Sequence, residues 1–400
     1  MIKKVFHGKL YRKNTDSDNS LWYFYRFNDH TKKVKPHKPS KKSKWLSLAF
    51  FLVNLVVVGI VLAIQLNSEA GVGHINQLFS KKSNIEFIFI AFGCFALAEC
   101  LIGLKINTLS KKYDKKANYF TSLKSEFVCQ YYNKVTPFSV GGQAFHVYEL
   151  NKHGMRANNA VTVVSCNYLS AKLVYWIVSL FMMITIGTNA LVKNMSGTSF
   201  YIVLGLAMFS LSFMTIYLTF IILICVNKKI ANKLVGVGLN LLYKLKIVKN
   251  KSKLYFKIMR PALAFQHKMQ SFFKSKNLAG YSLLISLIIY LIQSTIPACI
   301  YFIFQPFSWE IYWQLISISV VIQLSFGVMP MPGGSGVAEF SFFAVFKLLI
   351  QDNCVFWALL LWRILTYYIY LIIGLMIVIY DYAYGNRKLR KRRQKLKMNT

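Results

Sequence analysis

Two short segments combine proline and glycine with side chains that can bind an anion. They are residues 136–143 (TPFSVGGQ) and 329–339 (MPMPGGSGVAE), and each lies between apolar stretches. Proline lacks a backbone N–H and glycine adopts conformations closed to other residues, so both segments are expected to interrupt helices. The candidate binding residues are Pro137, Gly141, Gly142 and Gln143 in the first segment, and Pro332, Gly333, Gly334, Gly336 and Glu339 in the second.

Recognition of a phosphate is the chemistry that these segments favour. Gly336 precedes an apolar run that begins at Val337, and the free N–H groups at the start of a helix there would carry a partial positive charge. Interrupted segments in the two halves of a membrane protein are typical of transporter sites. A pair of purely structural turns explains the same residues equally well.

Five ionisable residues lie inside apolar runs, where each charge costs on the order of 3 kcal/mol unless it is paired or hydrated. Glu339 and Arg363 fall on successive runs of opposite direction, which predicts an ion pair between them. Lys347 and Glu99 lie near the ends of their runs, so we expect their side chains to reach the membrane surface. Lys172 remains as an intramembrane charge with a candidate role.

The sequence contains no pattern that indicates catalysis within the chain. Neither a Ser/His/Asp set, a Cys/His set nor paired carboxylates can be recognised, so no catalytic residue is predicted. The seven cysteines form no C-x-x-C pair, and His146 and His153 have no evident third ligand. We therefore expect no metal and no other cofactor.

The composition that surrounds these residues is that of a membrane protein. Of the 400 residues, 55% are apolar and 16% are charged, whereas about 25% are charged in soluble proteins. The net charge of +36 comes mainly from residues 1–44, 105–124, 227–277 and 381–400, which lie between or beyond apolar runs. The positive-inside rule explains this distribution. No basic face with base-reading groups is visible, so direct readout of nucleic acid is not expected.

The apolar runs predict an all-α fold. They are 45–66, 87–104, 160–186, 199–226, 278–304, 311–329, 337–350 and 354–380. A helix needs about 20 residues to cross a bilayer core, so the run 337–350 is too short and is expected to be half of a broken helix. Residues 119–150 are expected to enter the bilayer and return. The fold is thus a polytopic integral membrane helix bundle of about 7–8 transmembrane segments, including broken or re-entrant helices.

The charge distribution also divides the chain. We expect a basic cytoplasmic segment at 1–44, a transmembrane domain at 45–380 that includes a basic cytoplasmic linker at 227–277, and a basic cytoplasmic tail at 381–400. The linker is either an amphipathic helix on an anionic leaflet or a helix that covers the bundle. Both termini are predicted to be cytoplasmic and the loops 67–83, 187–198 and 305–310 to be external, in a multi-pass protein of the cell membrane.

Three motifs resemble the lysylphosphatidylglycerol synthase transmembrane-region family, a flippase-like membrane domain. They are Pro137 with GGQ (141–143) and YELNKHG (148–154), PGGSG (332–336) with Glu339, and RILTYY (363–368). The resemblance covers roughly 45–380. Gln143 stands where many members have Glu and looks like the variant seen in low-GC Gram-positive bacteria, which argues against any role that needs a charge there.

The resemblance implies flipping or transport of an anionic, aminoacylated or glycosylated lipid between leaflets. Arg363 and the two glycine-rich segments would bind the lipid, and the partners would be membrane phospholipids or glycolipids and a separate lipid-modifying enzyme. The alternative is a phosphatidylglycerol lysyltransferase, which makes lysyl-phosphatidylglycerol and gives resistance to cationic peptides, or an accessory subunit of one. About twenty residues follow Tyr380, too few for the fused aminoacyl-transferase domain, and whether the chain is an enzyme stays open. A third reading is a membrane scaffold whose basic tails gather anionic lipid.

Overall fold

The computed structural model describes residues 82–115, 117–139, 141–185, 198–226, 265–327, 329, 331–350 and 352–381, all within one compact unit of the chain. Every regular element in these residues is a helix, which confirms the all-α prediction. The basic segment 1–44, the apolar run 45–66, the linker residues 227–264 and the tail residues 382–400 lie outside the described residues.

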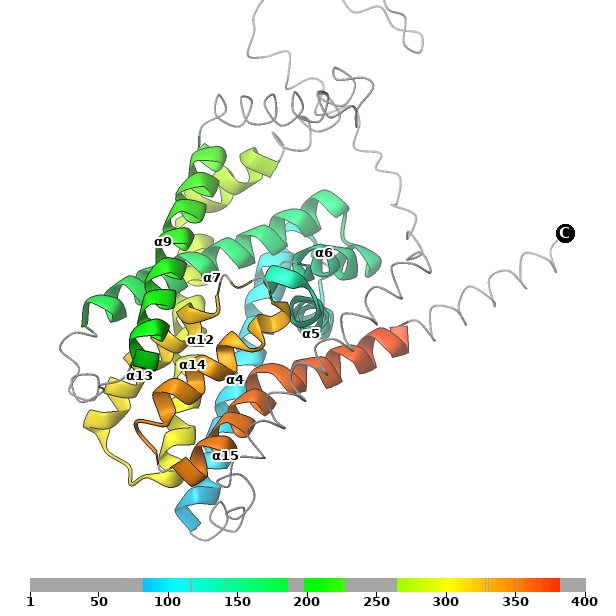
Figure 1. Ribbon diagram of the computed structural model, residues 1–400. Coiled ribbons are helices and arrows are strands. Elements are labelled where there is room, and N and C mark those ends of the chain that lie inside the picture. Colours follow the sequence, from blue (N-terminus) through cyan, green and yellow to red (C-terminus); the bar gives the residue numbers. More distant parts are fainter. Residues whose placement is uncertain are drawn as a thin grey trace, which may run out of the picture. The chain divides into compact units, whose positions relative to one another are not determined.

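Five helices in the described part are long and apolar enough to cross a membrane, so the chain is a multi-pass membrane protein. They are α4 (Lys82–Tyr113), α7 (Ala157–Thr185), α9 (Thr198–Val226), α12 (Lys276–Phe304) and the helix that begins as α15 (Asp352–Arg363), passes through a π-helical turn, η4 (Ile364–Tyr368), and ends at residue 381 (Figure 1). These correspond to five of the predicted runs. The helix α4 extends well beyond the predicted end at residue 104.

Both predicted interruptions are present. A short 3-10 turn, η3 (Pro332–Gly334), separates α13 (Trp309–Ser325) from α14 (Val337–Phe346). The ten residues of α14 reach only about 15 Å, so α14 cannot cross a bilayer alone, as the sequence predicts. The other interruption, η1 (Pro137–Ser139), joins α5 (Tyr119–Val135) to α6 (Gly142–Lys152), which pack against each other as a helical hairpin.

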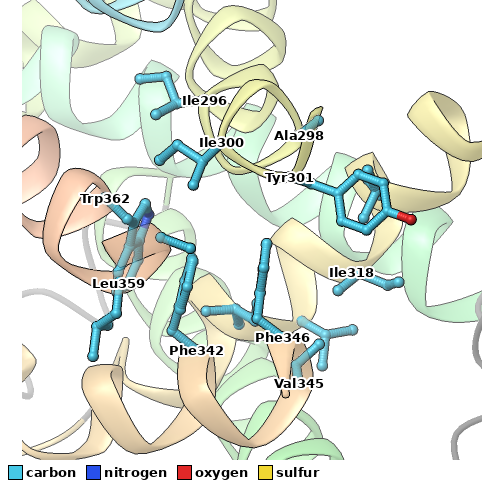
Figure 2. Packing of buried hydrophobic residues seen from close by; sticks show 14 of the residues in the cluster. Ile296, Ala298, Ile300, Tyr301, Ile318, Phe342, Val345, Phe346, Leu359 and Trp362 are labelled. Carbon is cyan, nitrogen blue, oxygen red and sulfur yellow. The ribbon is translucent and has the colours of Figure 1, made fainter. Parts of the chain in front are cut away.

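Aromatic packing holds α14 between its neighbours. Figure 2 shows Phe342 and Phe346 of α14 directed toward Trp362 of α15 and toward residues of α12. The Phe342 ring lies 3.9 Å from that of Phe346 and 4.8 Å from that of Trp362, centroid to centroid. Since lipid is as apolar as these side chains, close packing rather than the hydrophobic effect stabilises the contact. Outward-facing residues such as Phe89 and Ile216 are exposed and apolar, as lipid-facing residues should be.

One end of the bundle gathers basic groups. The start of α7 is tied to the end of α4 because Asn159 Nδ2 donates to the Tyr113 carbonyl at 3.2 Å, and Lys268 Nζ donates to Asn159 Oδ1 at 2.7 Å. The end of the final helix is tied to the hairpin because Asp381 contacts both Lys124 and Lys152, each at 2.6 Å. Partly exposed pairs of this kind are worth about 0–1 kcal/mol each, so they position these ends more than they stabilise the fold.

The opposite end gathers aromatic side chains. The Phe87 ring near the start of α4 lies 5.6 Å from Phe302 at the end of α12 and 6.0 Å from Phe307, and Phe307 contacts Trp309 at the start of α13. Aromatic belts of this kind mark a membrane interface, and basic residues mark the cytoplasmic side. The arrangement is therefore compatible with the predicted orientation.

The orientation predicts which ends a reagent in the medium can reach. In a variant without native cysteines, a cysteine replacing the exposed Glu310 at the aromatic end should react with an impermeant maleimide added to intact cells. A cysteine replacing the exposed Asn158 at the basic end should react only after the membrane is opened. The opposite labelling pattern would place the basic end outside.

Candidate functional site

The two interrupted segments lie against each other. The turn η1 contacts the turn η3, and η3 also contacts α5. Gly333 and Gly334 have φ values of +59° and +68°, which other residues rarely adopt. A Cβ atom at Gly333 would also overlap the ring of Tyr367, and one at Gly334 would come within 2.9 Å of the Phe326 ring. Glycine is thus required here by both backbone conformation and close approach, and the structure brings both predicted motifs to one place.

The start of α6 is capped from α5. Thr136 Oγ1 accepts a hydrogen bond from the N–H of Gly141 at 3.1 Å, and Asn133 Oδ1 accepts one from the N–H of Gly142 at 2.9 Å. Gln143 follows, half-buried, in the first turn of α6. The backbone donors of Gly141 and Gly142 are therefore occupied, and η1 serves to place α6 against α5.

The predicted ion pair between Glu339 and Arg363 is confirmed. Arg363 Nη2 lies 2.5 Å from Glu339 Oε1, and the two side chains are only 5% and 4% exposed. Glu339 Oε2 accepts a hydrogen bond of 2.6 Å from the N–H of Gly336, so the same carboxylate caps α14. The sequence assigned that N–H group to a phosphate; in this conformation, the anion at the start of α14 is Glu339 itself.

Arg363 retains hydrogen-bonding capacity beyond this pair. Its Nε atom is buried without a hydrogen-bond partner, and Nη2 contacts Glu339 as an ion pair without the alignment of a hydrogen bond. The guanidinium carbon lies 5.2 Å from the ring centroids of Trp362 and Tyr367, distances at which the cation is attracted to both rings. Arg363 is also the last residue before the π-helical turn η4, a distortion that is frequent at functional sites.

Further charges surround this pair, and the sequence reading missed most of them. Lys134 on α5 is close enough to Arg363 and to Glu99 for electrostatic interaction, and its ammonium lies 5.5 Å from the Tyr370 ring. Deeper in the hairpin, Glu126 interacts with Lys105 of α4, whose Nζ donates to the carbonyl of Asn167 at 3.1 Å. Like charges also meet here, since Lys134 lies near Arg363 and Glu99 lies near Glu126. The opposite charges of Glu99 and Lys105 offset part of the resulting cost.

The expectation for Glu99 was wrong. Its side chain is buried and accepts a 2.6 Å hydrogen bond from the Tyr370 hydroxyl instead of reaching the membrane surface. Since α4 continues to Tyr113, Glu99 lies about 21 Å along the helix from that end, too deep for the side chain to reach water. One sequence signal could have shown that Glu99 is buried, namely that its helix continues beyond the apolar run into the basic segment 105–124.

The other two intramembrane lysines differ from each other. Lys172 is half-buried on α7, with its ammonium 5.7 Å from the Tyr168 ring and 5.4 Å from the Tyr175 ring. Those aromatic rings, rather than the Arg363 site, are its neighbours. Lys347 at the end of α14 is exposed, with its ammonium 5.9 Å from the Phe343 ring.

The tight contact at Gly333 gives a stability prediction. Gly333→Ala should lower the thermal unfolding temperature of the purified protein, by the equivalent of about 1–3 kcal/mol, because the methyl group forces Tyr367 away. Gly154→Ala is the matched control, since Gly154 has a φ of +111° but open space around the missing Cβ. Equal losses in the two variants would mean that only the backbone conformation matters and that the contact with Tyr367 does not.

The comparison with known proteins agrees with the arrangement of these motifs. The family model described as the lysylphosphatidylglycerol synthase TM region matches residues 44–374, a range that includes both interrupted segments, Glu339 and Arg363. No curated protein and no solved structure matches the chain. The family relates the protein to the handling of membrane lipids. With most of its length matched, the chain belongs to the lysylphosphatidylglycerol synthase TM region family.

Proposed function

We propose that this protein moves an anionic, aminoacylated or glycosylated lipid between the two leaflets of the cell membrane. Arg363 binds the lipid phosphate where the two interrupted segments meet. The observation that carries the proposal is the buried guanidinium at this contact, whose Nε donor has no hydrogen-bond partner. Ionisable groups at membrane depth mark substrate pathways because their burial is otherwise costly.

Phosphate fits the vacant donors of Arg363 well. The planar guanidinium can donate two parallel hydrogen bonds to a phosphate, which an ammonium group cannot do with the same geometry. Glu339 occupies one side of the guanidinium, so lipid phosphate and Glu339 compete for it. Lys134 adds a second positive charge nearby, and the attraction for an anionic headgroup is correspondingly stronger.

Lipid binding requires a change of conformation. The Arg363–Glu339 pair is almost fully buried, so α14 and the final helix must separate before a headgroup can reach it. The helix α14 is suited to such a movement because it is short and follows a glycine-rich turn. When phosphate displaces it, the Glu339 carboxylate can keep its hydrogen bond to the Gly336 N–H through its other oxygen.

Transport measured with this protein alone tests the proposal. In liposomes that contain only the purified chain, a fluorescent phosphatidylglycerol should cross between leaflets faster than in protein-free liposomes. Arg363→Lys should slow this transfer by about 10- to 100-fold, because the charge stays but a charged hydrogen bond worth roughly 1.5–3 kcal/mol is lost. Glu339→Gln should raise the apparent affinity for the lipid by freeing the guanidinium. Lys347→Arg, at an exposed lysine away from the Arg363–Glu339 pair, should have no effect.

The double variant Glu339→Arg with Arg363→Glu distinguishes a role of the pair in lipid binding from a purely structural role. A purely structural pair costs about 3–5 kcal/mol when broken on one side, and the swap should restore folding. Restored folding without transport supports the phosphate role, whereas recovery of both would reduce the pair to a link between two helices. Formation of lysyl-phosphatidylglycerol from lysyl-tRNA, with no lipid transfer, would favour the lysyltransferase alternative.

A further inference from the structure

We propose that Glu126, Cys129 and His146 form a binding site for a divalent transition metal, best suited to Zn²⁺, inside the α5–α6 hairpin. This site is separate from Arg363 and does not depend on the proposed lipid transport. One carboxylate oxygen, the thiol sulfur and one imidazole nitrogen all lie within 4.8 Å of one another. Carboxylate, thiolate and imidazole are the three ligand types that zinc uses in proteins.

The hairpin itself creates this arrangement. Glu126 and Cys129 are three residues apart on α5, so they share one face of that helix. His146 comes from α6, which packs against α5. Gly142 allows the close approach, because a Cβ atom there would overlap the carbonyl oxygen of Cys129. The three donors thus come from opposite sides of one helix–helix contact.

Glu126, Cys129 and His146 are buried, with exposures of 4%, 2% and 1%. Gln130 Nε2 donates to Glu126 Oε1 at 2.6 Å and Asn133 Nδ2 donates to Cys129 Sγ at 3.7 Å, so His146 is the member of the three whose burial lacks a partner. The Nε2 atom of His146 is buried with no hydrogen-bond partner, although buried polar atoms normally have one. An imidazole nitrogen without a partner, next to a thiol and a carboxylate, is in the state from which it can bind a metal.

The spacing and charge suit a small dication. Ligand atoms around a tetrahedral zinc lie about 3.3–3.8 Å apart, given bond lengths of about 2.0–2.3 Å, so a contraction of about 1 Å closes the site. A thiolate and a carboxylate together neutralise the dication. Lys105 near Glu126 and the buried Glu99 carboxylate near the same residue offset each other. Three protein ligands leave a fourth position open.

A small cavity lies near the proposed site. It has a volume of about 30 Å³ and is lined in part by Ser122 of α5, Leu150 of α6, and the exposed Asn118 and His153. Ser122 lies one turn before Glu126, and Leu150 lies one turn after His146. The cavity is therefore lined by residues one turn from Glu126 and one turn from His146, and by none of the three ligand residues themselves.

Metal binding would fasten α5 to α6 immediately beside η1, which contacts η3. The site thus stiffens the hairpin that supports one of the two interrupted segments. This differs from the sequence expectation of no metal, which rested on the absence of a C-x-x-C pair and on the lack of a third ligand for His146 and His153. In the structure His153 lies at the exposed end of α6, next to Glu149, and the partners of His146 come from α5.

Cobalt provides a direct probe of the thiolate ligand. The purified full-length chain, stripped with a chelator, should bind about one equivalent of Co²⁺ and develop near-ultraviolet thiolate-to-cobalt absorption together with visible bands of a four-coordinate ion. Zn²⁺ should displace the cobalt and raise the thermal unfolding temperature. Cys129→Ser should abolish the thiolate absorption, and Glu126→Gln and His146→Asn should each weaken Zn²⁺ binding by at least about 100-fold.

Matched control variants test whether the metal binds at another site and whether a ligand variant has misfolded. Cys166→Ser alters another buried cysteine, and His153→Asn alters the neighbouring histidine; both should bind metal like the unchanged protein. Each variant is compared by its unfolding temperature without metal, which shows that it is folded. Absence of the thiolate absorption in the folded unchanged protein overturns the proposal. So does metal binding that survives in all three ligand variants, since the metal would then lie elsewhere.

Discussion

A backbone that leaves helical geometry at bilayer depth loses hydrogen-bond partners that lipid cannot replace, and this constraint organises the centre of the protein. Both interrupted segments meet it with nearby side chains. Asn133 and Thr136 accept hydrogen bonds from Gly142 and Gly141 at the first interruption, and Glu339 accepts one from Gly336 at the second. At each interruption, the glycines that let the backbone leave helical geometry thus lie next to the side chains that accept hydrogen bonds from their N–H groups.

The second interruption, at η3, also places the charge of Glu339 in the interior. The acceptor at the start of α14 is the buried carboxylate of Glu339. A buried negative charge needs a cation beside it, and Arg363 of the final helix provides that cation. A ligand that binds Arg363 therefore also affects Glu339, the residue that caps α14. This coupling between a binding group and a helix start gives a phosphate a means of moving α14, whose aromatic packing against Trp362 would change with it.

The α5–α6 hairpin carries several buried polar side chains. It supplies Lys134 to the surroundings of Arg363 and Glu126 to those of Lys105, and it carries the thiol and the imidazole next to Glu126. Lys124 and Lys152 hold the hairpin to the end of the final helix through their contacts with Asp381. The hairpin therefore links the basic end of the bundle to the contact between the interrupted segments, whether or not a metal occupies it.

Local composition was enough to predict five of the spans, the two interruptions and the need of Glu339 and Arg363 for a partner of opposite charge. Apolar run length, proline with glycine, and the cost of a lone charge in lipid each act over a few residues. The contact between η1 and η3 and the placement of Lys105, Glu126 and Lys134 in the interior were decided only by the tertiary structure. The helix α5 has the mixed composition of a surface helix, and only its enclosure by α4, α6 and the final helix makes its charges interior ones. Burial of this kind depends on helices far apart in the sequence, so no local pattern could indicate it.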